Sequence, residues 1–291
     1  MKAILILCSL VATFGLAAAE SPPLDIKRAD DAIVINVGAQ ELLRYQIEPL
    51  KDSKLPVQSA GYFHPVRTLK GTVVTEVAPA DHPHHRGIFL AWVEMHGKQD
   101  ADFWGWGQHA PTKDRRIVNV DAKDLKSGKG SASFTAINHW MAANQVMIKE
   151  ELRASVRVAD RGYYLDSHYT LTPTNDLTLS QWAFSGFCVR TRKDGTLKAY
   201  GPEGEINLPN PKHTEPKSDW PDTGMYSYVL SFADGKKARV AVYNDPENPP
   251  TLWHNHRDVR MLNPCIVAPA PVKLSAGKPF RLKYRVEVSD N

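Results

Sequence analysis

Residues 146–171, VMIKEELRASVRVADRGYYLDSHYTL, decide the fold class of this chain. Apolar and polar side chains alternate in two segments, Val146 to Val158 and Tyr163 to Leu171, which flank the turn formers Asp160-Arg161-Gly162. Alternation with a period of two residues is typical of a β-strand with one buried face. A glycine-containing turn between two such segments favours a hairpin. The stretch therefore predicts two adjacent antiparallel strands.

The same alternation recurs along most of the chain. It predicts further strands at Ala32 to Val37, Thr72 to Val77, Ile88 to Val93, Arg116 to Val120, Ser131 to Asn138, Leu177 to Val189, Tyr226 to Phe232, Ala238 to Tyr243 and Phe280 to Val288. Helical patterns are scarce, since Glu41 to Tyr45 is too short to be convincing and the 21 prolines disfavour long helices. Many short strands separated by turn formers predict an all-β fold, a large antiparallel β-sandwich.

The first 19 residues predict an export signal. Lys2 precedes an uncharged apolar run, Ala3 to Leu16, and Ala17-Ala18-Ala19 supplies the small residues that a signal peptidase needs. We expect cleavage before Glu20 and a secreted or periplasmic location. The apolar run is short for a bilayer span, although a retained anchor is the alternative. No later segment reaches the length of a membrane span, so none is expected in the mature chain.

Residues 20–291 are predicted to form a single β-sandwich domain, because they contain no linker, low-complexity tract or internal repeat. One stretch breaks the strand rhythm. Gly201 to Gly224 carries five prolines and is predicted to be a long surface loop, and loops of that length are often functional.

Charge and cysteine content narrow the partners. The formal net charge is +4, or +3 once Lys2 is removed, and the positive residues are interspersed with negative ones. No basic run is present, so nucleic acid is not an expected partner. Cys188 and Cys265 could form a disulfide in an oxidising compartment. Two buried thiols are the favoured alternative, since a chain of this size can bury a core without disulfides.

The segment Asp81-His82-Pro83-His84-His85-Arg86-Gly87 is the predicted active site. Pro83 favours an extended conformation at His82, and the apolar run Ile88 to Val93 that follows is typical of a strand buried on both faces. Polar groups held at the end of a buried strand are often reactive groups. The alternative is a polar surface turn.

Each residue of this segment has a chemistry that suits a site. Histidine is adapted to acid–base catalysis because its pKa lies near neutrality, so His82, His84 and His85 are the catalytic candidates. An extended chain would turn His82 and His84 to one side and His85 to the other. Arg86 offers a planar fork for an anionic group, and Asp81 can orient a histidine.

Three other segments supply candidate substrate-binding residues. Trp104 and Trp106 have faces on which a sugar ring can stack, although core tryptophans would give the same pattern. His64 and Arg67 belong either to the site or to a structural corner. His254 and Arg260 form a second cluster of histidine and arginine near the C-terminus. The histidines of Trp253-His254-Asn255-His256 could lie in one pocket with the Asp81 to Gly87 segment.

Several of these motifs resemble a known family. Tyr62-Phe63-His64-Pro65-Val66, the string Asp81 to Gly87, Asp102-Phe103-Trp104, Asn244-Asp245-Pro246 to Arg260 and the closing Arg281 to Val286 together resemble the PmoA-like family of unknown function in exported bacterial proteins. The resemblance implies a β-sandwich similar to the galactose-mutarotase-like supersandwich. It also implies a role in the use of polysaccharides, without a defined reaction.

The leading hypothesis is a secreted carbohydrate-active enzyme that acts on a glycoside or uronide, with an oligosaccharide or small molecule as its partner. Hydrolysis would need a carboxylate, for which the candidates are Asp102, Glu203, Glu205 and Asp222. No cofactor is required by this hypothesis. One alternative is a zinc or copper enzyme with His82 and His84 as ligands, joined by His64 or His254. The other is a non-catalytic sugar-binding module.

Overall fold

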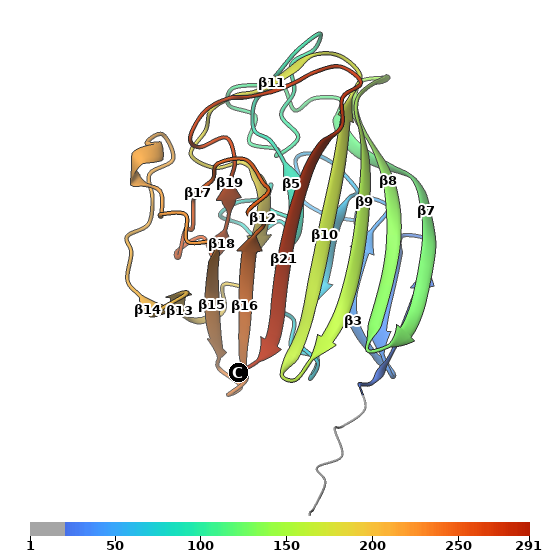
Figure 1. Cartoon of the computed structure of the whole chain (residues 1–291), viewed down its shortest axis with the longest axis vertical. Coiled ribbons are helices and arrows are strands. Elements are labelled where there is room, and N and C mark those ends of the chain that lie inside the picture. The colour runs from blue at the N-terminus through green and yellow to red at the C-terminus, as the bar shows by residue number, and fades with distance from the viewer. Residues whose placement is uncertain (1–20) are drawn as a thin grey trace, which may run out of the picture.

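The computed structural model describes residues 21–291 (Figure 1). The predicted export signal, residues 1–19, lies outside the described residues. The strands are β1 Pro23–Arg28, β2 Ala32–Val37, β3 Gln40–Gln46, β4 Tyr62–Val66, β5 Ile88–Ala91, β6 Met95–His96, β7 Arg115–Lys129, β8 Ser131–Ala142, β9 Gln145–Ala159, β10 Gly162–Pro173, β11 Leu177–Leu179, β12 Gly186–Arg190, β13 Gly195–Gly201, β14 Gly204–Ile206, β15 Met225–Phe232, β16 Lys237–Asn244, β17 Leu252–Trp253, β18 Met261–Leu262, β19 Pro264–Cys265, β20 Val272–Leu274 and β21 Phe280–Asp290.

One large sheet dominates the described chain. Within residues 21–291, sixteen strands join in the order β14-β13-β15-β16-β21-β10-β9-β8-β7-β1-β2-β3-β4-β5-β12-β18, and neighbouring strands run antiparallel. In Figure 1 the long strands β7 to β10 and β21 form one curved layer, with β3 and β5 behind them. The predicted all-β antiparallel sandwich is confirmed.

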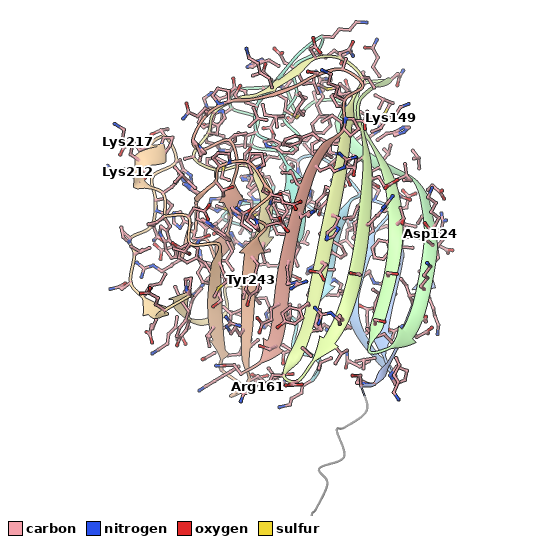
Figure 2. All side chains as sticks on the ribbon, viewed as in Figure 1. Asp124, Lys149, Arg161, Lys212, Lys217 and Tyr243 are labelled. Atoms are coloured by element: carbon pink, nitrogen blue, oxygen red, sulfur yellow. The ribbon has the colours of Figure 1, made fainter. Side chains whose placement is uncertain are left out.

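The hairpin of β9 and β10 shows how the sequence builds this layer. Ala159 pairs with Gly162 at the turn, and the register continues to Ile148 opposite Pro173. Every second side chain of β9 from Ile148 to Val156 is buried. The intervening side chains face outward, as Lys149 does in Figure 2. The period-two pattern therefore separates core from surface as predicted.

Two segments that were each predicted as one strand do not form one continuous strand. Thr72 to Val77 forms only isolated bridges, because Val73, Thr75 and Val77 each pair with a different segment. Leu177 to Val189 is divided into β11 and β12, which belong to different sheets. The break ends at Ser185, whose hydroxyl accepts the Val93 N–H at 3.0 Å. The alternation of apolar and polar residues does not show where a segment stops pairing with one strand and begins to pair with another.

The described chain contains almost no helix. Glu41 to Tyr45 lies within strand β3, and the described chain has one short 3-10 helix, η1, at Pro216–Ser218. Across residues 21–291 no helix has the length and apolar character that crossing a membrane requires. Cys188 and Cys265 are free, buried thiols.

Candidate functional site

The predicted active-site segment is a pair of tight turns rather than an extended strand. The His82 N–H donates to the Pro79 carbonyl and the His85 N–H donates to the His82 carbonyl, each at 3.0 Å. Gly87 then leads into β5 with a φ of 62°, and a Cβ there would lie 2.2 Å from the Phe63 carbonyl oxygen. Glycine is therefore required at the point where the turns meet the buried strand.

These turns bring the three imidazoles together, so the expectation that His85 would face away from His82 and His84 is wrong. The rings of His82 and His85 are stacked, with centroids 4.9 Å apart and an interplanar angle of 25°. The His84 ring meets the edge of His85 at 4.7 Å and 87°. An extended chain would separate alternate side chains, whereas a turn can place all of them on one side.

The three rings form one wall of a cavity of about 260 Å³. Two further histidines of the lining come from distant segments, His213 from the proline-rich Gly201 to Gly224 segment and His256 from the late histidine motif. His213 and His256 are themselves stacked at 5.9 Å. The remaining lining residues are Trp106, Gln108, Phe184, Val259 and Met261.

The imidazoles around the cavity are uncharged at neutral pH. Burial, with neighbouring cationic groups, lowers the pKa of His84 to about 3, and burial lowers that of His256 to about 4. Burial also lowers the pKa of His82 and His213, and it lowers that of His85 well below its ordinary value. A neutral imidazole offers one nitrogen as a hydrogen-bond donor and the other as an acceptor. The cavity is therefore uncharged, and the imidazoles and Gln108 add polar atoms to a mostly apolar lining.

Arg86 and Trp104 do not line the cavity. Arg86 is almost fully buried, donates through Nη2 to the Phe103 carbonyl at 2.9 Å and lies 4.7 Å over the Phe89 ring. It belongs to the core, so the expected binding of an anionic substrate group by Arg86 has no support from its position. Trp104 is fully buried and packs edge-on against His85 at 5.6 Å, which supports that ring from behind.

Trp106 is the tryptophan that reaches the cavity, and Asp102 fixes its loop. The two carboxylate oxygens of Asp102 accept the N–H groups of Gly105 and Gly107, at 2.7 and 2.6 Å. Gly105 has a φ of 101°, and a Cβ there would lie 3.1 Å from the Cβ of His84. Asp102 thus acts as a structural anchor and is not free to serve as a catalytic carboxylate.

The other predicted binding residues lie away from the cavity lining. His64 Nδ1 contacts the Thr75 hydroxyl at 2.9 Å, and the Arg67 side chain faces Glu41 at 4.0 Å. Arg260 donates to the Gly195 carbonyl at 2.6 Å. His254 does not line the cavity but lies beside His213, with the two rings 5.6 Å apart, and its Nδ1 is 2.7 Å from Asp219 Oδ1.

None of the four proposed hydrolytic carboxylates lines the cavity. Glu205 pairs with Lys198 at 2.9 Å on the surface, and Glu203 is exposed. Asp222 accepts the Gly224 N–H and the Trp253 indole N–H. In the part of the chain that the structure describes, no three His, Cys, Asp or Glu side chains are placed to share a metal ion. The proposed zinc or copper ligand set is therefore not assembled.

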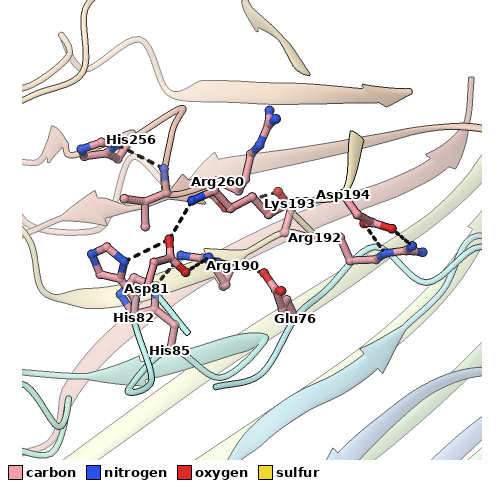
Figure 3. A network of polar contacts seen from close by, with 12 residues as sticks. Glu76, Asp81, His82, His85, Arg190, Arg192, Lys193, Asp194, His256 and Arg260 are labelled. Carbon is pink, nitrogen blue, oxygen red and sulfur yellow. Dashed lines mark hydrogen bonds and ion pairs between the residues drawn. The ribbon is translucent and has the colours of Figure 1, made fainter. Parts of the chain in front are cut away.

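Sequence reasoning missed two residues that complete the site. His213 lies in the Gly201 to Gly224 segment, whose length indicated a function, but as a lone histidine it was not singled out within it. Arg190 ends the apolar strand β12 and is fully buried, with its guanidinium between Asp81 and His85 (Figure 3). A cation at the end of a buried apolar strand is the signal that could have identified it, because such a charge needs partners.

Comparison with solved structures finds distant similarities. The galactosidase domain of an alpha-galactosidase-sucrose kinase matches 92% of this chain at 8% identity and a TM-score of 0.47, and this chain spans 42% of it. A galactose mutarotase-like protein from Lactobacillus casei matches over 91% of this chain and 99% of its own at 11% identity and a TM-score of 0.35. A heparan sulfate lyase from Pedobacter heparinus matches over 94% and 36% at 8% identity and a TM-score of 0.41.

A search of curated proteins finds no significant match. The resemblance to the PmoA-like family is wrong, because the family model that matches residues 32–291 is a different one. Those residues include both the Asp81 to Gly87 segment and the late histidine motif. The chain belongs to the family of unknown function DUF6807.

Proposed function

We propose that this chain is a carbohydrate-active enzyme that uses histidine acid–base chemistry and acts after export from the cytoplasm. The observation that carries the proposal is the cavity that His82, His84 and His85 line together with His213 and His256. N-terminal sequencing of the exported protein tests this part of the proposal, and a mature chain that begins at Glu20 is the expected result.

The cavity suits a sugar in size and in surface. A volume of about 260 Å³ is close to the lower end of small-molecule sites, which fits a monosaccharide unit rather than a long chain. Trp106 and Phe184 offer aromatic faces for the C–H side of the ring. The imidazoles and Gln108 offer donors and acceptors for hydroxyl groups. Neutral lining groups suit a sugar because they bind hydroxyls without the desolvation of a charge.

The lining favours proton transfer over two-carboxylate hydrolysis. Glycoside hydrolysis ordinarily uses a pair of carboxyl groups on either side of the bond. The groups that line this cavity are imidazoles, an amide, aromatic rings and aliphatic side chains. An imidazole can remove a proton from a hydroxyl or from a carbon next to a carbonyl and can return it elsewhere. Isomerisation or elimination is therefore the reaction class that we propose.

The test is turnover of candidate sugars followed by NMR spectroscopy. Free aldoses, uronic acids and uronide oligosaccharides are incubated with the protein, and new or exchanging sugar signals are recorded. We expect His84→Gln and His85→Gln to lower turnover by about 10²-fold or more, since both rings line the cavity and a positioned acid, base or hydrogen-bond donor usually contributes that much.

His168→Gln is the matched control, because His168 lies on an exposed position of β10. It should retain full turnover. Unchanged turnover in both His84→Gln and His85→Gln would contradict the proposal. Saturable sugar binding without any product over long incubation would instead assign a sugar-binding module.

A further inference from the structure

We propose that the Asp81–Arg190 ion pair fixes opposite tautomers on His82 and His85, which makes His82 the base and His85 the hydrogen-bond donor of the site. The chemical roles rest on the function proposed above. The tautomers are a property of the protein alone and can be measured without a substrate.

Arg190 determines the tautomer of His85. Its Nη1 lies 3.3 Å from His85 Nδ1, and a guanidinium has only donors and keeps its proton in proteins. His85 Nδ1 must therefore be the acceptor, so the neutral ring carries its proton on Nε2. The Arg190 side chain is fully buried and is held by Asp81 Oδ1 at 3.0 Å and by Glu76 Oε2 at 3.4 Å. It cannot turn away without leaving a buried charge unpaired.

Asp81 determines the tautomer of His82. Its Oδ2 lies 3.3 Å from His82 Nδ1, and Lys193 Nζ contacts the same oxygen at 3.1 Å (Figure 3). Partial burial alone would raise the pKa of Asp81, but Arg190, Lys193 and His82 hold it well below its usual range. The carboxylate is therefore ionised. Its contact with His82 Nδ1 is electrostatic and not an aligned hydrogen bond, but a lone pair on that nitrogen would face a negative charge at 3.3 Å. His82 Nδ1 therefore keeps the proton, and Nε2 keeps a lone pair.

Nδ1 of each ring faces the ion pair, so Nε2 is the nitrogen that remains for a substrate on both rings, bare on His82 and protonated on His85. His82 and His85 are stacked at 4.9 Å, and both line the cavity. Burial and Arg190 lower the pKa of both rings, but Asp81 opposes this on His82, whereas no carboxylate does so on His85, where Arg86 lowers the pKa further. The other titratable groups around these rings are His84, His213 and His256, which are uncharged in this site. His82 is therefore the ring of the pair that can take a proton.

The proposed step is balanced without any co-reactant. A substrate O–H or C–H bond breaks, its proton moves to His82 Nε2, and its electron pair stays on the substrate as an alkoxide or enolate. The resulting oxyanion accepts a hydrogen bond from His85 Nε2–H, and His85 does not lose its proton. His82 then returns its proton to the substrate at the original or a neighbouring atom. A neutral imidazole acting as an electrophile in this way is a known arrangement of a proton-transfer site.

Nitrogen-15 NMR of histidine-labelled protein tests the tautomers directly, because a bare imidazole nitrogen resonates far downfield of an N–H nitrogen. The rings are assigned by comparison with His82→Gln and His85→Gln. We expect His85 to be bare at Nδ1 and His82 to be bare at Nε2. Either ring in the opposite tautomer in the unmodified protein would overturn the inference, whatever the variants do.

Asp81→Asn provides the matched perturbation, because its amide can donate to His82 Nδ1 and reverse that tautomer. We expect the His82 signals to change and turnover to fall by about 10²-fold or more. Asp194→Asn is the control, since Asp194 pairs with Arg192 in the same region without contacting a histidine (Figure 3). Unchanged His82 signals in folded Asp81→Asn would also overturn the inference. If the protein has the predicted tautomers but turns over no sugar, the proposed function is wrong and the inference about the tautomers stands.

Discussion

Glu150 couples the protonation of one residue to the stability of the core. Its side chain is buried on β9, where its two oxygens accept hydrogen bonds from Asn138 Nδ2 and Trp140 Nε1, each at 2.7 Å. Burial raises the pKa of Glu150 from 4.5 to about 7, against the lowering effect of these two bonds. The carboxyl group is therefore easier to protonate in the folded chain than in the unfolded chain.

The sign of the resulting pH dependence follows from this difference. Between pH 4.5 and about 7 the folded state binds the proton and the unfolded state does not, so this contribution is complete below pH 4.5 and is lost as the pH rises through about 7. The unfolding free energy of the wild type should therefore fall by about 3 kcal/mol between pH 4.5 and about 7, and we expect Glu150→Gln to remove this fall. Urea unfolding at several pH values measures it. Glu151→Gln, on the exposed side of β9, should keep the wild-type profile; an unchanged slope in Glu150→Gln would contradict the prediction.

Among the elements, the strands were predictable and the loops that carry the site were not. The pattern of β9 and β10 identifies both strands because each pairs with a sequence neighbour and buries every second side chain. The Asp81 to Gly87 segment could be recognised from its composition. Its conformation could not, because Arg190 lies more than 100 residues away in the sequence and holds Asp81 and His85 in place. Alternation contains no information about such a contact.

The proline-rich Gly201 to Gly224 segment is anchored to the body of the protein by Trp220. This indole is almost fully buried, donates through Nε1 to the Pro209 carbonyl at 2.7 Å and packs against Tyr226. The backbone of Trp220 also pairs with that of Trp253. The anchor therefore holds in place the segment that supplies His213 to the cavity.

We expect Trp220→Ala to destabilise the protein by about 3–5 kcal/mol, as is usual when a large buried aromatic side chain is truncated. Hydrogen exchange across residues 207–224 should accelerate, and sugar binding should weaken because the His213 wall is no longer fixed. His213→Ala should weaken binding without faster exchange, which separates the anchor from the contact. Lys217→Ala, an exposed change in the same segment (Figure 2), is the control. Wild-type exchange in Trp220→Ala would show that the segment has another anchor.

At the scale of the whole molecule, the buried histidines of the cavity and of other sites lower the free energy of unfolding in acid. Burial, with further cationic neighbours at some sites, lowers the pKa of His84 and His254 to about 3 and that of His64 and His256 to about 4. Unfolding would restore these imidazoles to their ordinary pKa of about 6.5. Between these values the unfolded chain binds protons that the folded chain excludes. The stability is therefore complete above about pH 6.5 and is lost as the pH falls toward 4.

The acid loss is best measured in the Glu150→Gln background, because Glu150 acts with the opposite sign over much of the same range. We expect the melting temperature of this variant to fall steadily from pH 7 to pH 4.5. Adding His84→Gln or His256→Gln should make the fall shallower, since each removes a group that takes up a proton on unfolding. His168→Gln, on the exposed side of β10, should leave it unchanged. A melting temperature that is constant across this range would mean that the cavity admits protons in the folded state, and the neutral imidazoles on which the proposed chemistry depends would then not exist at acidic pH.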